Sequence, residues 1–412
     1  MSRNSAADAR GRRIAIAGAG IGGLALAARL ARLGHSPVVF EGRSEVAAVS
    51  EGTFLTLAPN GMNGLRLVDA DAAVEAAGID TTGIEIRGSS GKRLNLADQR
   101  DHRTTFGAPS ITLGRGMLAA LLLERARQAG AEVRFDAAVA AVDARSDGVT
   151  VLLADGSTYD ADVLVAADGL RSTVRGLVFP DYPQPAYTGL IGTGGTVEAD
   201  IEPTGGVMRM TFGDLAFFGY IRPADGPVYW FNSYPAEESE IGRIADPGGY
   251  ARRIGALHAG DPEPNARILA VVDRLERNYP VYDMPALPAW YRGRVVLMGD
   301  AAHAIGPHTG QGASMAIEDA MILAACLDVE AAPETAFARY EAIRRRRVEQ
   351  VVMLTRRLGS QKRASGWLSV MIRDLLLPLV IPFGIKAGRK LFAYRVDRDP
   401  AICPANKRED RE

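Results

Sequence analysis

A glycine-rich turn between an apolar run and an Ala/Leu-rich stretch is the feature that most limits how this chain can fold. The turn, Gly-Ala-Gly-Ile-Gly-Gly at residues 18–23, follows the apolar residues 14–17. The apolar residues predict a buried strand, residues 23–32 predict a helix that stops at Gly34, and residues 38–40 predict a second strand. Together they predict a βαβ unit, which builds sheets of parallel strands.

The spacing of the turn's glycines matches G-x-G-x-x-G. Gly18 permits the tight turn, Gly20 lets backbone amides approach a pyrophosphate, and Gly23 lets the helix pack close to the strand. The start of the helix supplies further amide donors for phosphates. Glu41 comes 23 residues after Gly18, at the end of the second strand, where an acid binds ribose hydroxyls. The sequence therefore predicts a dinucleotide site, without deciding which dinucleotide binds.

Two later segments repeat the pattern of an apolar strand that ends in an acid. Residues 163–167 lead into Asp168-Gly169, and residues 295–298 lead into Gly299-Asp300. An acid at the end of a strand can accept hydrogen bonds from a polyol or from backbone amides. With the glycine turn, these segments offer three approaches to one extended cofactor.

In combination, these motifs resemble the class A FAD-dependent monooxygenases, the para-hydroxybenzoate-hydroxylase-like aromatic hydroxylases. The resemblance covers residues 12–330 and includes the P-x-x-G-x-G pattern and helix that follow Asp300. It implies that FAD is the cofactor, that Asp300 binds the ribityl chain, and that Asp168 contacts FAD and the passing nicotinamide cofactor. Arg115, in an R-x-x-L pattern, would also contact FAD. The expected cofactor-binding residues are Gly18, Gly20, Ile21, Gly22, Gly23, Glu41, Arg43, Arg115, Asp168, Asp300, Pro307, Gly310, Gly312 and Ala313.

Three positions depart from the family pattern. Gly42 separates Glu41 from the basic Arg43, Ala304 stands where proline is common, and Ser314 stands where asparagine is frequent. None of them removes a cofactor-binding glycine or acid. They therefore affect details of flavin contact rather than the assignment.

The resemblance also implies a reaction. NADH or NADPH, bound transiently, reduces FAD, and a flavin C4a-hydroperoxide then hydroxylates an aromatic or polycyclic, phenolic or enolic small molecule with oxygen from O2. One alternative keeps the fold but not the oxygenation, as in a flavin reductase or dehydrogenase of the geranylgeranyl-reductase type. Another is a non-catalytic flavin- or nucleotide-binding module. A flavin-dependent halogenase is disfavoured because the chain lacks a W-x-W-x-I-P run.

The chain between the motifs predicts a second kind of sheet. Residues 180–285 are rich in proline, glycine and aromatics between β-like stretches, and residues 83–96 read as a hairpin that joins them. We expect an α/β fold in which a Rossmann-like FAD-binding domain (10–82, 104–180 and 286–330) interleaves with a mostly antiparallel β-sheet substrate domain (83–103 and 181–285). Residues 331–412 are expected to form a C-terminal helical region.

Substrate is expected between the flavin and this second sheet. The candidate substrate-binding residues are Met210, Phe212, Phe218, Tyr220, Trp230, His308 and Thr309. Because strand side chains alternate, about half of the sheet aromatics should face away from substrate. His303 and His308 lack the spacing of a metal site, so no metal is expected. His303 is interpreted as a structural hydrogen-bonding residue, and His308 is the single candidate for a catalytic role.

Charge and composition narrow the class of protein. The chain has 48 basic and 49 acidic residues, so nothing attracts it to nucleic acid. Two cysteines, Cys326 and Cys403, and an N-terminus without an apolar segment lead us to expect a cytoplasmic protein. The apolar run 375–383 is broken by prolines and is too short to span a membrane. The basic runs 344–347 and 356–363 are expected to be solvated helix faces, with phosphate binding as the alternative. The protein is expected to be a monomer or homodimer.

Overall fold

The computed structural model describes residues 11–50, 52–242, 244–360 and 381–402. Cys403, most of the apolar run 375–383 and the end of the second basic run lie outside the described residues. Within the described part of the chain, no helix combines the length and the apolar character needed to cross a membrane.

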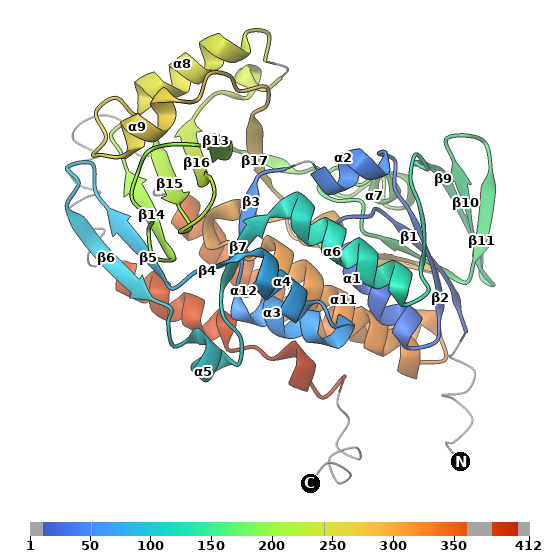
Figure 1. Ribbon diagram of the computed structural model, residues 1–412. Helices are drawn as coiled ribbons and strands as arrows, with labels where there is room; N and C mark the ends of the chain where they lie inside the picture. The colour runs from blue at the N-terminus through green and yellow to red at the C-terminus, as the bar shows by residue number, and fades with distance from the viewer. Residues whose placement is uncertain (1–10, 51, 243, 361–380, 403–412) are drawn as a thin grey trace.

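A six-stranded sheet forms the first half of the molecule, on the right of Figure 1. Its strands, in spatial order, are β18 (Tyr291–Arg292), β19 (Val295–Leu297), β12 (Val163–Ala166), β1 (Arg13–Ala17), β2 (Ser36–Phe40) and β8 (Glu132–Arg134). All pairs are parallel except β18 with β19. Apart from their first residues, the central strands β12, β1 and β2 are apolar and buried, as expected for a parallel sheet covered on both faces. The helices α1 (Ile21–Arg32), α6 (Arg115–Gln128) and α11 (Gly312–Val329) share this core.

Two small sheets flank the parallel one. One of them contains a hairpin that turns at Asp155-Gly156, with Gly156 at a φ of 85°. It belongs to a sheet of β9 (Val139–Ala144), β10 (Val149–Leu153) and β11 (Thr158–Ala161). The other small sheet contains β3 (Phe54–Leu57), β4 (Ile79–Asp80) and β7 (Ile111–Gly114).

A seven-stranded sheet forms the second half, on the left of Figure 1. Its spatial order is β17 (Tyr279–Asp283), β13 (Ala186–Val197), β16 (Val228–Pro235), β15 (Phe217–Ile221), β14 (Val207–Phe212), β5 (Gly83–Arg87) and β6 (Arg93–Asp98). Only the β14–β5 pair is parallel. The helices α8 (Pro247–Leu257) and α9 (Asn265–Ala270) pack on one face and form a second hydrophobic core with it. The predicted fold class is confirmed, whereas the exact domain boundaries stay a prediction.

The described part of the chain contains further helices. They are α2 (Glu45–Ser50), α3 (Pro59–Leu65), α4 (Asp71–Ala77), α5 (His102–Phe106), α7 (Thr173–Val178), α10 (Asp300–His303) and α12 (Pro333–Ser360), with short 3-10 turns η1 (Arg66–Val68), η2 (Glu238–Glu240), η3 (Pro307–Thr309) and η5 (Val396–Arg398). A further helical stretch covers 381–392. The first basic run lies in α12, and the expectation that it is solvated is wrong for Arg344, whose side chain is 0% exposed. It is buried because acids on α11 pair with it.

Candidate functional site

The predicted motifs meet at one edge of the parallel sheet. Gly18 follows β1, Glu41 follows β2, Asp168 lies just after β12, and Asp300 lies just after β19. Since these four strands are adjacent and parallel, their carboxyl ends share an edge, where open α/β sheets bind ligands. Backbone bonds tie the strand ends together, with the Gly18 N–H donating to the Phe40 carbonyl at 2.8 Å.

The glycines of the first turn are required for different reasons. Gly18 has a φ of 101°, and a Cβ there would lie 2.5 Å from the Ala167 carbonyl oxygen. A Cβ on Gly23 would lie 2.0 Å from the Gly18 oxygen, so close packing of the helix excludes any side chain. A Cβ on Gly20, in contrast, would meet no protein atom within 4 Å. The space beside Gly20 therefore fits a ligand that approaches the backbone, as a pyrophosphate does. Ile21 and Gly22 begin α1, with Gly22 packed near Met298.

Glu41 is held by the turn and by Arg43. Its carboxylate accepts the Ala19 N–H at 2.9 Å and the Arg43 Nε at 2.9 Å. Burial would raise the pKa of Glu41, but the hydrogen bonds from Arg43 and Ala19 outweigh it and lower the pKa. The acid is therefore ionised, with its acceptor oxygens beside the glycine turn.

Asp168 has one partnered and one unpartnered oxygen. Oδ2 accepts the Val174 N–H at 3.1 Å, and the buried Oδ1 has no hydrogen-bond partner within the described part of the chain. Burial raises the pKa of Asp168. Arg175, which is 3% exposed, joins this motif to the late one, because its guanidinium donates to the carbonyls of Leu170 and Ala301.

Asp300 is exposed, although protein surrounds it closely. That surrounding protein desolvates the carboxylate and raises its pKa, in spite of the nearby charges of His303 and Arg115. Gly299, immediately before it, has a φ of 59° and donates its N–H to Asp319 Oδ2 at 3.1 Å. The turn thus presents the accessible carboxylate of Asp300 on a backbone that the buried Asp319 holds in place.

The segment after Asp300 leads into α11 through two glycines. Pro307 begins η3, Gly310 has a φ of 63°, and a Cβ on Gly312 would meet nothing within 4 Å. Ala313 follows Gly312 in the first turn of α11 and is partly buried. Arg115 begins α6 and is exposed.

His308 and Thr309 both contact α12. The His308 ring lies so close to Gly359 that a Cβ there would be 2.5 Å from the His308 Cδ2 atom. The Thr309 hydroxyl lies 2.8 Å from that of Thr355. The single candidate for a catalytic side chain is therefore half-buried against a helix, and a role for it stays a prediction.

The structure divides the predicted sheet aromatics between two faces. Phe218, Tyr220 and Trp230 belong to the core beneath α8 and α9, where Phe218 stacks on Trp230 at 5.9 Å and meets His258 edge-on at 5.1 Å. The strand register puts Met210 and Phe212 on the opposite face. Only these two of the five sheet candidates are thus free of the second core.

We call the opposite side the aromatic face, and its rings come from two sheets. Phe54 of β3 lies 5.4 Å from Tyr229 and 5.8 Å from Phe231 in β16, in edge-to-face contacts. Phe217 lies 5.9 Å from Phe231 and 4.8 Å from Phe212. Phe54, Phe212, Tyr229 and Phe231 are partly exposed. Sequence reasoning missed Phe54, Phe217, Tyr229 and Phe231.

A glycine on the neighbouring strand carried the missing signal. A Cβ on Gly219 would lie 2.3 Å from the Phe231 ring, so this ring occupies the space beside Gly219. Gly219 in the run Phe-Phe-Gly-Tyr-Ile therefore marks the face on which a large ring from the next strand rests.

Comparison with known proteins agrees with this geometry. The family model described as "FAD binding domain" matches residues 12–203 and 281–355. The chain is 31% identical over 372 residues to aurachin C monooxygenase/isomerase of Stigmatella aurantiaca, which covers 89% of this chain and 94% of the relative. It is 32% identical over 355 residues to 3-amino-4-hydroxybenzoate 2-monooxygenase of Streptomyces cremeus, covering 85% and 87%. The structure of Klebsiella pneumoniae HpxO complexed with FAD and uric acid superposes with a TM-score of 0.82 at 24% identity, covering 93% of this chain and 97% of that one.

Proposed function

This chain belongs to the class A FAD-dependent aromatic monooxygenases, and on that premise we propose that it hydroxylates a phenolic or enolic ring compound with NADH or NADPH as reductant and O2 as oxygen source. The observation that carries the proposal is the convergence of four strand ends at one edge, where Gly20 leaves room for a ligand and Asp300 stays accessible.

These residues fit FAD. The open backbone at Gly20 and the start of α1 would hold the pyrophosphate, Glu41 would accept a ribose hydroxyl, and Asp300 would accept hydroxyls of the ribityl chain. When bound, FAD would take a hydride from the nicotinamide cofactor and activate O2 at its C4a position. The chain's own residues position the cofactor and the substrate and exclude water.

The aromatic face supports a ring-shaped, largely apolar substrate. Phe54 and Phe231 are partly exposed rings in edge-to-face contact, an arrangement that accepts a further flat ring. The curated relative from Streptomyces cremeus acts, by its name, on a hydroxybenzoate. We therefore place the substrate of this chain among hydroxylated aromatic or heteroaromatic rings that pack on the aromatic face.

The test is a substrate screen with the purified, FAD-loaded protein. NADH and NADPH oxidation is followed with a panel of hydroxylated benzoates, quinolones and pyridines, O2 uptake is recorded in parallel, and products are identified by mass. We expect at least one compound to stimulate nicotinamide oxidation and to gain one oxygen atom. Labelling with 18O2 should place the label in the product.

The same measurements identify the competing reaction. Stimulated nicotinamide oxidation without incorporation of oxygen would contradict the proposal and indicate a flavin reductase of the same fold. FAD binding without any ligand-stimulated oxidation would instead indicate a binding module.

A further inference from the structure

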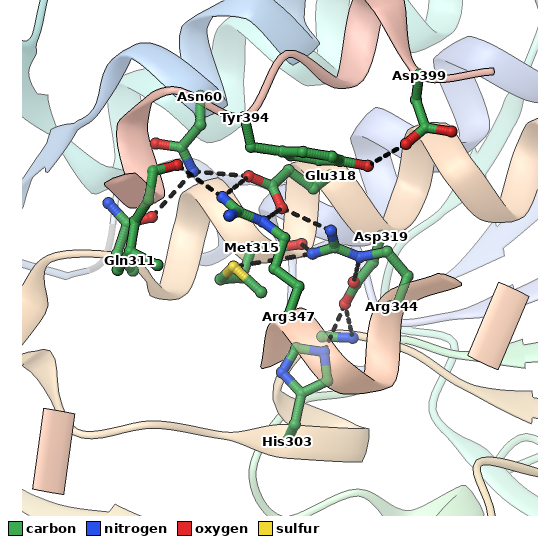
Figure 2. A network of polar contacts seen from close by, with 12 residues as sticks. Asn60, His303, Gln311, Met315, Glu318, Asp319, Arg344, Arg347, Tyr394 and Asp399 are labelled. Carbon is green, nitrogen blue, oxygen red and sulfur yellow. Dashed lines mark hydrogen bonds and ion pairs between the residues drawn. The ribbon is translucent and has the colours of Figure 1, made fainter. Parts of the chain in front are cut away.

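Two adjacent acids on α11 are buried and share one arginine. Glu318 and Asp319 have fully buried side chains, as does Arg344 of α12. The Arg344 guanidinium lies 2.6 Å from Glu318 Oε2 and donates its Nε to Asp319 Oδ1 at 2.7 Å. Figure 2 shows Arg344 between the two carboxylates. We call Glu318, Asp319 and Arg344 the α11–α12 bridge.

One arm of the bridge reaches the turn that carries Asp300. Asp319 Oδ2 accepts the Gly299 N–H at 3.1 Å and lies 2.6 Å from His303 Nε2. His303 is 7% exposed and contacts the Trp290 ring, so the expected structural role for this histidine fits its surroundings. Asp319 therefore holds both ends of the short helix that begins at Asp300.

The other arm reaches the start of α11. The Asn60 amide donates to Glu318 Oε1 at 2.7 Å and to Gln311 Oε1 at 2.9 Å, and Gln311 immediately precedes the first residue of α11. Arg347 donates to both Glu318 oxygens at 2.7 Å, and the Tyr394 ring covers the Arg347 guanidinium at 4.3 Å. Figure 2 shows Asn60 between Gln311 and Glu318.

At the start of each cofactor-facing segment, only backbone hydrogen bonds act locally. No side-chain cap bonds the start of α10 or of α11, and the glycines Gly299 and Gly310 have positive φ angles. Glycine-rich backbone of this kind has several conformations open to it. The bridge supplies the missing constraint from the opposite side, through Asp319 to the first segment and through Glu318 to the second.

A gain in folding stability does not by itself explain why these charges are buried. Burial would raise the pKa of both acids, but their cationic partners outweigh it, so the pKa of Glu318 is lowered and that of Asp319 falls to about 2. Desolvating such charges is costly, and apolar residues of similar volume often stabilise a core as well or better. A buried ionic group instead fixes geometry, because its hydrogen bonds have defined directions.

We propose that the α11–α12 bridge is a positioning device for FAD, which sets the distance between the Gly299-Asp300 turn and the first turn of α11. The inference rests on the proposed function, since it assigns both segments to the cofactor site. Glu318, Asp319 and Arg344 are positioning residues that act through the backbone of Gly299 and the side chain of Gln311.

The test compares bridge variants with a variant that weakens a part of the protein away from the cofactor site. Asp319→Asn and Glu318→Gln are measured beside Phe218→Leu, which weakens the second core, for FAD dissociation constant, visible flavin spectrum and melting temperature of the apoprotein. We expect each bridge variant to weaken FAD binding at least tenfold, about 1.4 kcal/mol, and to shift the flavin absorbance bands. Phe218→Leu should lower the melting temperature with FAD affinity and spectrum unchanged.

Asn60→Ala covers the case in which the charge-removing variants Asp319→Asn and Glu318→Gln do not fold. It cuts the link from Glu318 to Gln311 without leaving a buried charge unpaired, and it should shift the flavin spectrum with a smaller loss of affinity. Because both arms share Arg344, the Asp319→Asn/Glu318→Gln double variant should lose less affinity than the sum of the single losses.

Two results would overturn the inference. Bridge variants and Asn60→Ala that bind FAD with wild-type affinity and spectrum, at whatever melting temperature, would reduce the bridge to a structural ion pair. A wild-type protein that binds no FAD would instead overturn the proposed function and the inference with it.

Discussion

At the scale of single residues, Gly20 is needed for ligand binding, whereas Gly23 is needed for the packing of the fold. Gly20→Ala should leave the apoprotein's melting temperature unchanged, because the new Cβ meets no protein atom within 4 Å. It should weaken FAD binding at least tenfold, because that space is where the pyrophosphate approaches. Gly23→Ala should destabilise the apoprotein itself by roughly 1–3 kcal/mol or more, since overpacking displaces the turn. Thermal unfolding and FAD titration of both variants give the comparison, and equal behaviour would contradict it.

The buried carboxylate of Asp319 predicts a pH dependence. His303 and Arg344 outweigh the effect of burial and lower its pKa from 3.8 to about 2. A lowered pKa means that the stabilisation is fully present above about pH 4 and is lost as the pH falls toward 2. The loss is on the order of 2 kcal/mol for a shift of this size. Urea unfolding of the apoprotein should therefore show a flatter pH dependence in Asp319→Asn than in wild type over this range. Parallel curves would contradict the prediction.

Single residues also mark where sequence reasoning failed. The sequence indicates that Gly18, Glu41 and Asp300 lie at strand ends, because each follows a run of apolar residues that predicts a strand. Arg344 could not, because it stands in a run of four arginines and burial depends on which of them faces Glu318 and Asp319. That choice depends on how α12 packs on α11, which no local pattern specifies.

At the scale of elements, the strands of the large sheet were predictable but their facing was not. The runs at 217–221 and 228–235 predict strands through their aromatic and β-branched residues. Both faces carry large rings, so alternation alone does not tell which face the helices α8 and α9 cover. The sequence therefore does not exclude Phe218, Tyr220 and Trp230 as substrate candidates, although the structure places them in the second core.

The two faces should respond differently to the same substitution. Phe218→Leu removes a ring from the second core and should cost roughly 0.5–3 kcal/mol of unfolding free energy, with KM for the substrate unchanged. Phe231→Leu removes a partly exposed ring from the aromatic face and should raise KM severalfold at a smaller cost in stability. Steady-state kinetics with the substrate found by the screen, beside chemical denaturation, test the pair. A larger KM effect from Phe218→Leu would reverse the assignment of the faces.

At the scale of the whole molecule, bound FAD should stabilise the fold by contacting parts of the chain that are distant in sequence. The residues expected to contact FAD lie between positions 18 and 313 and come from several separate strand ends. Ligand that binds only the native state stabilises it by about 2.7 kcal/mol at a hundredfold excess over its dissociation constant. Removal of FAD should therefore lower the melting temperature, and readdition should restore it. A melting temperature independent of FAD would argue that the site is not coupled to folding.

The order of strands in the parallel sheet also bears on how a ribosome delivers this protein. β1 pairs with β2 on one side and with β12 on the other. The second neighbour of β12 is β19, which begins at residue 295. During synthesis, an apolar strand edge therefore stays unpaired until much later parts of the chain emerge from the exit tunnel. Unpaired edges of this kind associate with other chains. Association of the exposed edges of β1 and β12 with other chains therefore competes with folding until the late strand β19 has been made.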